Sequence, residues 1–323
     1  MYLFEQRAAT ILYRLAKGLP GDGMVLLPAN VCPVVPLVFA KAGVKYEFVD
    51  ISPLTLCMDE DSAEELLRQA PARYVALVFV RAYGHYSNVS PFFARLKVLN
   101  PELLLIDDRC LMPPDFTGTD FGGADLLLYS TGYSKIVDLR WGGFALTGDG
   151  LSYPRSDTPY NPADWQVLDQ SYKRHLGARM KFLYRDSDWL DTRPPVPDFA
   201  GYRKEVLGKI SAALDHRQRL NDIYTRLLPA EIQLPSSWQL WRFNVMVPDK
   251  EGLLRKIAAA GLFASSHYAS LGGVFSERRM VNAERVHHKI VNLFNDFHFD
   301  ESKAEKVAEI VNRHLDEWQG DMF

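Results

Sequence analysis

The sequence has few cysteines and no excess of basic charge. Three cysteines among 323 residues, Cys32, Cys57 and Cys110, are too few and too scattered for a disulfide framework or a CxxC metal knuckle. We therefore expect a reducing, cytoplasmic setting. The 37 Lys and Arg residues against 40 Asp and Glu argue against nucleic acid as a partner, because domains that bind it carry a basic excess.

Long apolar runs are missing as well. Glu5 and Arg7 lie where a signal peptide would need apolar residues. The most apolar stretch, residues 24–40, contains Asn30 and three prolines and is followed by Lys41. We therefore expect neither a secretion signal nor a membrane-spanning helix.

Three common site motifs do not occur either. GxxxxGK[ST] and HExxH are absent, and the cluster of Gly18, Gly21 and Gly23 precedes a predicted strand, whereas a dinucleotide-binding turn follows one. The glycine cluster is therefore predicted to be a plain turn. His287 and His288 are adjacent and not four residues apart, so no metal site is expected.

The first 150 residues alternate apolar strands with amphipathic helices. Strands are predicted at 24–28, 46–50, 74–80, 103–107, 125–130 and 143–147. Helices are predicted at 6–17, 34–42, 61–70 and 90–100, the third opening on a capping box of Asp61 and Glu64. This alternation is typical of a mostly parallel sheet covered by helices on both faces, so the predicted fold class is α/β.

The pattern changes after residue 150. Residues 151–197 are rich in Tyr, Trp, Asp and Pro, which predicts extended loops with one helix near 166–183. A long helix at 202–228 leads to predicted strands at 241–247 and 289–294 and helices at 250–260 and 301–315. We predict a large domain over residues 1–200, and an interdomain helix with a small C-terminal α+β domain over 201–323.

Reactive side chains follow two of the predicted strands. Ligands of parallel sheets bind at the carboxyl ends of strands, where Asp107 and Asp108 end one strand and Ser130 and Lys135 follow the next. A lysine can form a Schiff base, a carboxylate can keep a pyridine nitrogen protonated, and a serine with backbone amides suits a phosphate. These are the parts of a pyridoxal 5′-phosphate (PLP) site.

Motifs along most of the chain extend this observation. In chain order they are RAATILYRL, LLPANVCPVVPLVFAKAGVKYEFVDI, RAYGHYSN, IDD, YSTGYSK, WGGF, GLFASSHYASL and AERVHHKIVNLFNDFHFDESKAEKVAEIV. Together they resemble motifs of the DegT/DnrJ/EryC1/StrS aminotransferases, PLP enzymes of fold type I that mostly aminate keto sugars on nucleotides. YSTGYSK keeps that family's five-residue interval between the phosphate-binding serine and the lysine that attaches the cofactor.

The resemblance implies roles for the residues at matching positions. Lys135 would attach the cofactor and then carry a proton, and Asp108 would contact the pyridine nitrogen. Asp107 is expected to be a strand-end residue bonded to backbone. The residues implied to bind the phosphate are Ser130, Arg7, Ala8 and Ala9. Further candidates for the cofactor site are Asn30, Cys32 and His85, and those for substrate contacts are Arg140, Trp141, His267 and Tyr268.

Two positions depart from the family pattern. Leu111 stands where the family carries a polar side chain that bonds the cofactor's phenolic oxygen, so Asn30 or another loop would have to supply that contact. Cys32 lies near the place of an aromatic residue that covers the ring face, so stacking would come from elsewhere, with His85 and Tyr83 as candidates.

The leading hypothesis is a cytoplasmic PLP-dependent aminotransferase that moves an amino group from glutamate to the keto sugar of a nucleotide-sugar. The family also implies a homodimer and a part in polysaccharide biosynthesis. Leu111 keeps a PLP-dependent lyase or dehydratase, or an aminotransferase for a non-sugar ketone, open as alternatives. A third hypothesis, a non-catalytic protein of this fold, is opposed by the presence of both Lys135 and Asp108.

Overall fold

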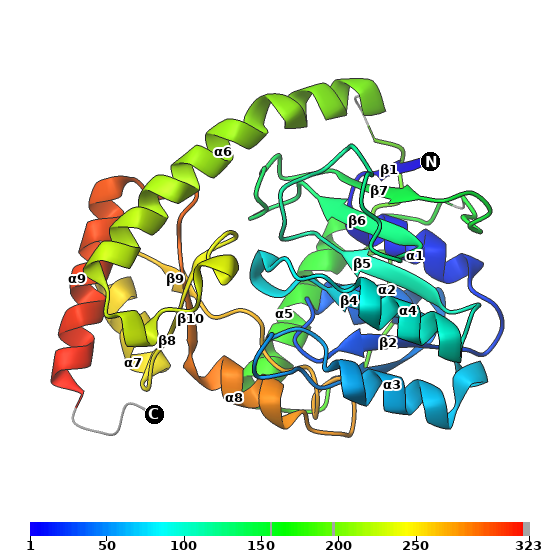
Figure 1. The fold of residues 1–323 in the computed structure, drawn as a ribbon, viewed down its shortest axis with the longest axis horizontal. Coiled ribbons are helices and arrows are strands. Elements are labelled where there is room, and N and C mark those ends of the chain that lie inside the picture. The colour runs from blue at the N-terminus through cyan, green and yellow to red at the C-terminus, as the bar shows by residue number, and fades with distance from the viewer. Residues whose placement is uncertain (156, 196–197, 319–323) are drawn as a thin grey trace.

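The computed structural model describes residues 1–155, 157–195 and 198–318. Its strands up to residue 147 are β1 (Tyr2–Glu5), β2 (Met24–Pro28), β3 (Lys45–Val49), β4 (Tyr74–Val80), β5 (Leu104–Asp108), β6 (Leu126–Ser130) and β7 (Gly143–Thr147). They form one seven-stranded sheet in the order β1-β7-β6-β5-β4-β2-β3 (Figure 1). Strands β2 to β6 pair in parallel, while β7 pairs antiparallel with β6 and β1.

This sheet confirms the predicted α/β fold class. The six predicted strands are all present, and their ends differ from the prediction by at most one residue. Strand β1 was not predicted, and it exists because its whole length pairs with β7. The helices of this part are α1 (Ala8–Gly18), α2 (Val34–Ala42), α3 (Glu60–Gln69), α4 (Ser90–Leu99) and α5 (Pro162–Ala178).

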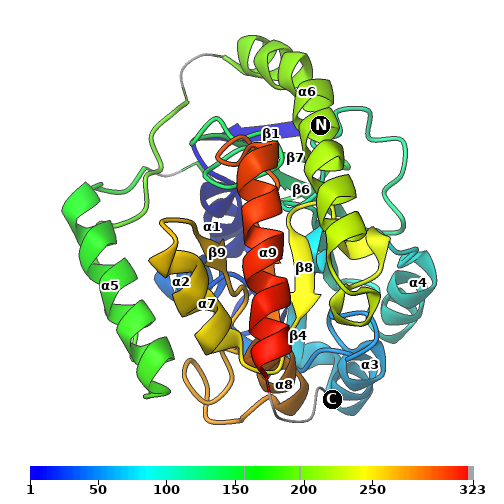
Figure 2. The ribbon, with the colours of Figure 1, turned by 90° about the vertical axis from the view of Figure 1, so that its left-hand side faces the viewer.

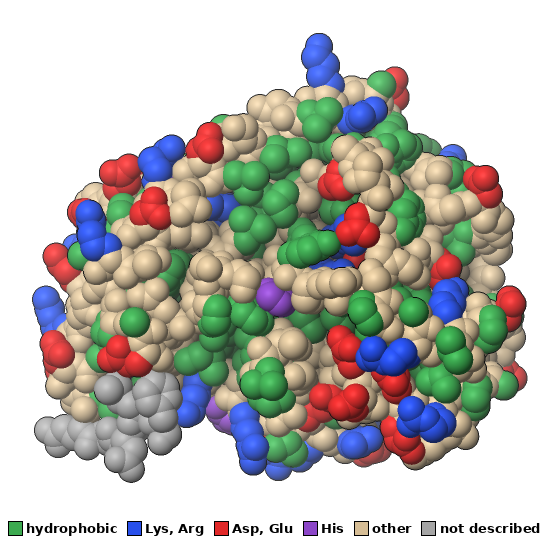
Figure 3. All heavy atoms as spheres, viewed as in Figure 1, with side chains coloured by type: hydrophobic (Ala, Val, Ile, Leu, Met, Phe, Trp, Pro, Cys, Tyr) green, Lys and Arg blue, Asp and Glu red, His purple; other side chains and the backbone are tan. Residues whose placement is uncertain are grey.

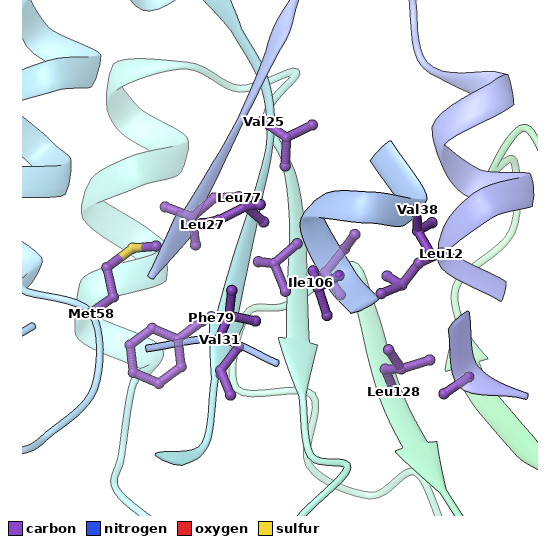
Figure 4. Packing of buried hydrophobic residues seen from close by; sticks show 14 of the residues in the cluster. Leu12, Val25, Leu27, Val31, Val38, Met58, Leu77, Phe79, Ile106 and Leu128 are labelled. Carbon is purple, nitrogen blue, oxygen red and sulfur yellow. The ribbon is translucent and has the colours of Figure 1, made fainter. Parts of the chain in front are cut away.

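The core lies between the sheet and its helices. Strands β2, β4 and β6 are almost wholly apolar and buried, as expected for parallel strands covered on both faces. Figure 4 shows part of this core, with Leu12 of α1 and Val38 of α2 beside the strand residues Ile106 and Leu128.

The predicted cap of α3 is wrong by two positions. Asp59 has extended backbone angles and accepts a hydrogen bond from the Ser62 N–H at 2.9 Å, so it is the N-cap. Asp61 already lies in the first helical turn, where its negative charge still favours the helix N-terminus.

A second, smaller sheet follows the long helix α6 (Phe199–Leu227). Strands β8 (Phe243–Met246), β10 (Ile290–Leu293) and β9 (Ala264–Ser265) pair antiparallel, and helices α7 (Lys250–Ala259) and α9 (Glu301–Glu317) pack with them around a separate buried cluster. Helix α8 (Val281–Lys289) precedes β10. Figures 1 and 2 show α6 running from the large sheet to this small sheet unit, with α9 against its C-terminal half. The domain boundary at residue 200 stays a prediction.

The surface agrees with the near-balanced composition. Figure 3 shows Lys and Arg mixed with Asp and Glu over one face, without a large area of one sign. Within the described ranges, no helix is long and apolar enough to cross a bilayer. The same residues contain no group of three or more metal-ligating side chains placed to hold an ion.

A buried ion network supports the carboxyl ends of β4 and β5. Asp107 accepts hydrogen bonds from Nε and Nη2 of Arg81 at 2.7 and 2.8 Å, and from Nε of Arg109 at 2.8 Å. Arg109 also reaches the Tyr129 hydroxyl at 3.3 Å. Asp107 was expected to bond to backbone, which is wrong, because an arginine follows each of the two strands and both guanidinium groups turn to its carboxylate.

Replacing Asp107 by Asn should destabilise the protein strongly. The two guanidinium groups would stay buried without their counter-charge, which costs about 3–5 kcal/mol in the free energy of unfolding. Urea unfolding measures this loss. The control is Glu205→Gln, which breaks the exposed Lys209–Glu205 pair and should change stability by less than about 0.5 kcal/mol. Equally small effects of both changes would contradict this interpretation of the network.

Candidate functional site

A cavity of about 350 Å³ lies at the carboxyl ends of β5 and β6. Its walls come from the N-terminal turns of α1 and α2, from the ends of both strands and from the loop between β6 and β7. The predicted cofactor residues among its lining are Arg7, Ala8, Ala9, Cys32, Asp108, Ser130 and Lys135. Segments far apart in the sequence thus place most of the predicted cofactor residues around one space.

Asp108 is a buried carboxylate with few groups around it that stabilise its negative charge. It is 6% exposed, and it accepts a hydrogen bond from the Cys110 N–H at 2.9 Å. Burial is the main cause that raises the pKa of this carboxyl group, and the positive charge of Lys135 opposes the rise. A protonated pyridine nitrogen would bring both a donor and a positive charge, so this position fits the ring of PLP.

Another part of the cavity lining is suited to an anion. Helix α1 begins at Ala8 and has no acidic residue in its first turn. Ala8 and Ala9 line the cavity, so the free N–H groups of this first turn lie at the cavity. Strand β7 approaches this helix so closely that a Cβ atom on Gly143 would lie 2.2 Å from the Ala8 nitrogen. The Ser130 hydroxyl lines the same cavity and accepts the Gly132 N–H at 3.2 Å. A phosphate would find amide and hydroxyl donors here.

Lys135 lies in a strained but braced loop between β6 and β7. Ser134 and Arg140 adopt positive φ angles of 59° and 64°, which are unfavourable for residues with a side chain. The Asp138 carboxylate accepts the N–H groups of both residues at 2.8 Å each. This loop therefore holds Lys135 between two fixed backbone turns.

Two cysteines and a tyrosine complete the surroundings of Asp108. Cys32 and Cys110 line the cavity, and burial raises the pKa of both thiols, which keeps them protonated. Burial also raises the pKa of Tyr268, with smaller contributions from Cys32 and Asp108. The Tyr268 ring stacks on Trp241 with a centroid distance of 6.0 Å. The predicted substrate residue Tyr268 therefore lies next to the cofactor residues.

His267 and Arg140 border the same region. His267 is exposed, and its backbone N–H donates to Oδ1 of Asn292 at 2.6 Å. Its ring centroid lies 5.7 Å from that of Trp241. Arg140 and Lys135 both line a second cavity of about 420 Å³ that extends along α6. A substrate contact by His267 or Arg140 stays a prediction.

The structure places the remaining candidates outside the lining of the cofactor cavity. Asn30 is buried and donates to the Leu56 carbonyl at 2.9 Å, so its amide serves the neighbouring loop. His85 stacks on Trp238 at a centroid distance of 3.8 Å. Trp141 packs against aromatic side chains of β1 and α6.

Sequence reasoning missed one wall of the cavity. Trp165 in α5, together with Trp189 and Leu190, also lines the cavity, and the two indole rings lie 5.7 Å apart. The only sequence signal was the aromatic richness of residues 151–197, which carries no periodicity from which a wall could be inferred.

Comparison of the sequence finds no match among protein family models or among curated proteins. Comparison of the structure finds many similar folds. Spr1654 from Streptococcus pneumoniae, provisionally named a sugar aminotransferase and solved in its PMP-form, superposes with a TM-score of 0.74 at 15% identity, covering 98% of this chain and 88% of that one.

Two further similar structures widen the range of activities. A DegT DnrJ EryC1 StrS aminotransferase from Brucella abortus has a TM-score of 0.67 at 15% identity, covering 97% of this chain and 85% of that one. The GDP-4-keto-6-deoxy-D-mannose-3-dehydratase of E. coli, with bound hydrated PLP, has a TM-score of 0.65 at 16% identity, covering 96% and 87%. At these identities the likeness establishes the fold, and the chain has the fold of the PLP-dependent sugar aminotransferases.

Proposed function

We propose that this protein is a PLP-dependent aminotransferase that acts on a keto sugar. The observation that carries the proposal is one cavity that combines Lys135, the under-compensated carboxylate of Asp108 and the N-terminal turn of α1. The fold shared with sugar aminotransferases and the order of the sequence motifs support it.

The chain's own residues suggest a division of labour. When bound, PLP supplies an electron sink for the carbon that carries the amino group. Asp108 would keep the ring nitrogen protonated through a charge-assisted hydrogen bond, which is strong in a buried site. Ser130 and the amides of α1 hold the phosphate. Lys135 would hold the cofactor through its Nζ atom, and the same amine would be the group that accepts and returns a proton there.

Finer parts of the proposal concern the amino donor, the substrate, the cellular setting and the assembly. Glutamate as amino donor, a nucleotide on the sugar, a cytoplasmic setting and a part in polysaccharide biosynthesis follow from the motif resemblance. A homodimer is also supported by exposed apolar side chains on α5 and the segment after it: Val167 is 69%, Met180 57% and Leu183 70% exposed. Figure 2 shows α5 at the outer edge of the chain, so a second subunit would cover these exposed side chains.

A dehydratase is the second candidate. Leu111 is 3% exposed and apolar at the position where the family motif has a polar side chain. A PLP-containing dehydratase is also among the structures with this fold. The fate of the cofactor separates the two, because transamination converts it to its amine form and dehydration does not.

Lys135→Ala should abolish covalent attachment of PLP. We expect the wild-type protein to develop a visible absorption band with PLP that glutamate bleaches, and the variant to show no such band. Lys209→Ala is the control, since Lys209 lines the neighbouring cavity and should leave the band unchanged. The proposal fails if Lys135→Ala gives the wild-type spectrum, and a wild-type band that resists amino donors favours the dehydratase.

Asp108→Asn should weaken PLP binding without destabilising the cofactor-free protein. Loss of a charge-assisted hydrogen bond costs about 1.5–3 kcal/mol, or roughly a 10- to 150-fold rise in Kd, measured by titration with PLP.

The same change should alter how stability depends on pH. Because burial raises the pKa of Asp108 in the folded state above 3.8, the folded protein binds more protons than the unfolded chain just above that pH. This carboxyl group therefore lowers stability as pH rises through its folded pKa. Urea unfolding at several pH values measures this effect. As pH rises above 3.8, the free energy of unfolding should fall less in Asp108→Asn than in the wild type, and an equal fall in both proteins would contradict the assignment.

A further inference from the structure

Two side chains from the C-terminal part of the chain bind the backbone at Lys135. The indole Nε1 of Trp241, just before β8, donates to the Ser134 carbonyl at 2.6 Å. Nη2 of Arg217, in α6, donates to the Lys135 carbonyl at 3.1 Å. The two donor side chains are 2–3% exposed, so both are buried.

We propose that Arg217 and Trp241 form a clamp that positions Lys135 from the small sheet unit. The influence of the clamp on cofactor attachment rests on the proposed function. Its influence on the backbone of the loop between β6 and β7 does not depend on that function. Both are positioning residues, because they hold the lysine's backbone and leave its side chain free to react.

The two donors of the clamp are tied to each other. Nη1 of Arg217 donates to the Trp241 carbonyl at 2.9 Å and to Oδ1 of Asn295 at 2.6 Å. Arg242 also reaches the Trp241 carbonyl, at 3.2 Å, and pairs with Asp296 at 2.8 Å. Asn295 and Asp296 follow β10, so the clamp is anchored to the small sheet unit.

Hydrogen bonds from inside and outside the loop fix the backbone around Lys135. Inside the loop, Asp138 braces the N–H groups of Ser134 and Arg140, and the carbonyls of Ser134 and Lys135 point to the clamp. The lysine side chain is long and flexible, so it does not fix the position of its own Nζ atom. The position of the backbone therefore sets the region that Nζ can reach. A displacement of about 1 Å at a reacting group can cost about 100-fold in rate.

The charge of Arg217 is costly to keep buried. Burial, together with the neighbouring charge of Arg242, lowers the pKa of Arg217 to about 10, and Asp296 and Asp138 oppose the shift. Its Nε atom is buried without a hydrogen-bond partner. An apolar side chain would fill this place at lower desolvation cost, so packing alone does not account for an arginine here.

Matched variants separate the clamp from general stability. Arg217→Met and Trp241→Phe keep most of the volume and remove the donors, and Arg217→Lys restores one donor. The controls are Arg219→Met, an exposed arginine on the same helix, and Trp238→Phe, whose indole donates to the Thr55 carbonyl instead. Thermal unfolding of every variant shows that it is folded before it is compared.

Two measurements test the clamp. Hydrogen–deuterium exchange of residues 131–142 in the cofactor-free protein reports on the loop. Two properties of the visible PLP band report on Lys135. They are the rate at which the band forms and the pH midpoint at which half of its absorbance is lost. We expect faster exchange, a rate about 10- to 100-fold lower and a shifted pH midpoint in Arg217→Met and Trp241→Phe, with partial recovery in Arg217→Lys.

The outcomes distinguish the clamp from the proposed function. Unchanged exchange in both donor variants overturns the clamp, whether or not PLP binds. Faster exchange with an unchanged rate and pH midpoint shows a loop contact without influence on Lys135, and also overturns the positioning role. If the wild type does not attach PLP at all, the proposed function fails, and the exchange data alone decide whether the clamp holds the loop.

Discussion

The alternation of side chains along β5 is the constraint on which the site depends. Successive residues of a strand point to opposite faces, so the adjacent carboxylates Asp107 and Asp108 cannot share an environment. Asp107 turns to Arg81 and Arg109, which neutralise it in the interior. Asp108 lines the cavity, where burial raises its pKa and leaves it in need of a positive donor. One strand end thus separates a structural from a functional carboxylate.

The antiparallel strand β7 brings the other parts of the site to Asp108. It returns the chain from the Lys135 loop to the sheet and packs, through Gly143, directly on the first residue of α1. Lysine, carboxylate and helix N-terminus therefore meet at one edge, although they come from separate segments. Arg217 and Trp241 add a connection from this edge to the small sheet unit.

Local sequence patterns were sufficient for most of the large sheet and for the places of three polar side chains at its edge. Continuous apolar runs predicted the strands, and the rule for strand ends predicted the places of Asp108, Ser130 and Lys135. Strand β1 and the two-residue β9 were missed because each exists through pairing with a neighbour, which a four-residue or shorter pattern cannot reveal. The tryptophan wall and the clamp were missed for a related reason: the clamp joins residues 82 and 107 positions apart.

The central claim is that Lys135 is the lysine that binds PLP. Borohydride reduction of the protein incubated with PLP, followed by peptide mass spectrometry, tests it most directly. The account predicts a stable pyridoxyl group on the peptide that contains Lys135, and no preference for that peptide over other lysine-containing peptides when the protein is unfolded before PLP is added. A label on Lys209 or on many surface lysines, with Lys135 unmodified, would contradict it.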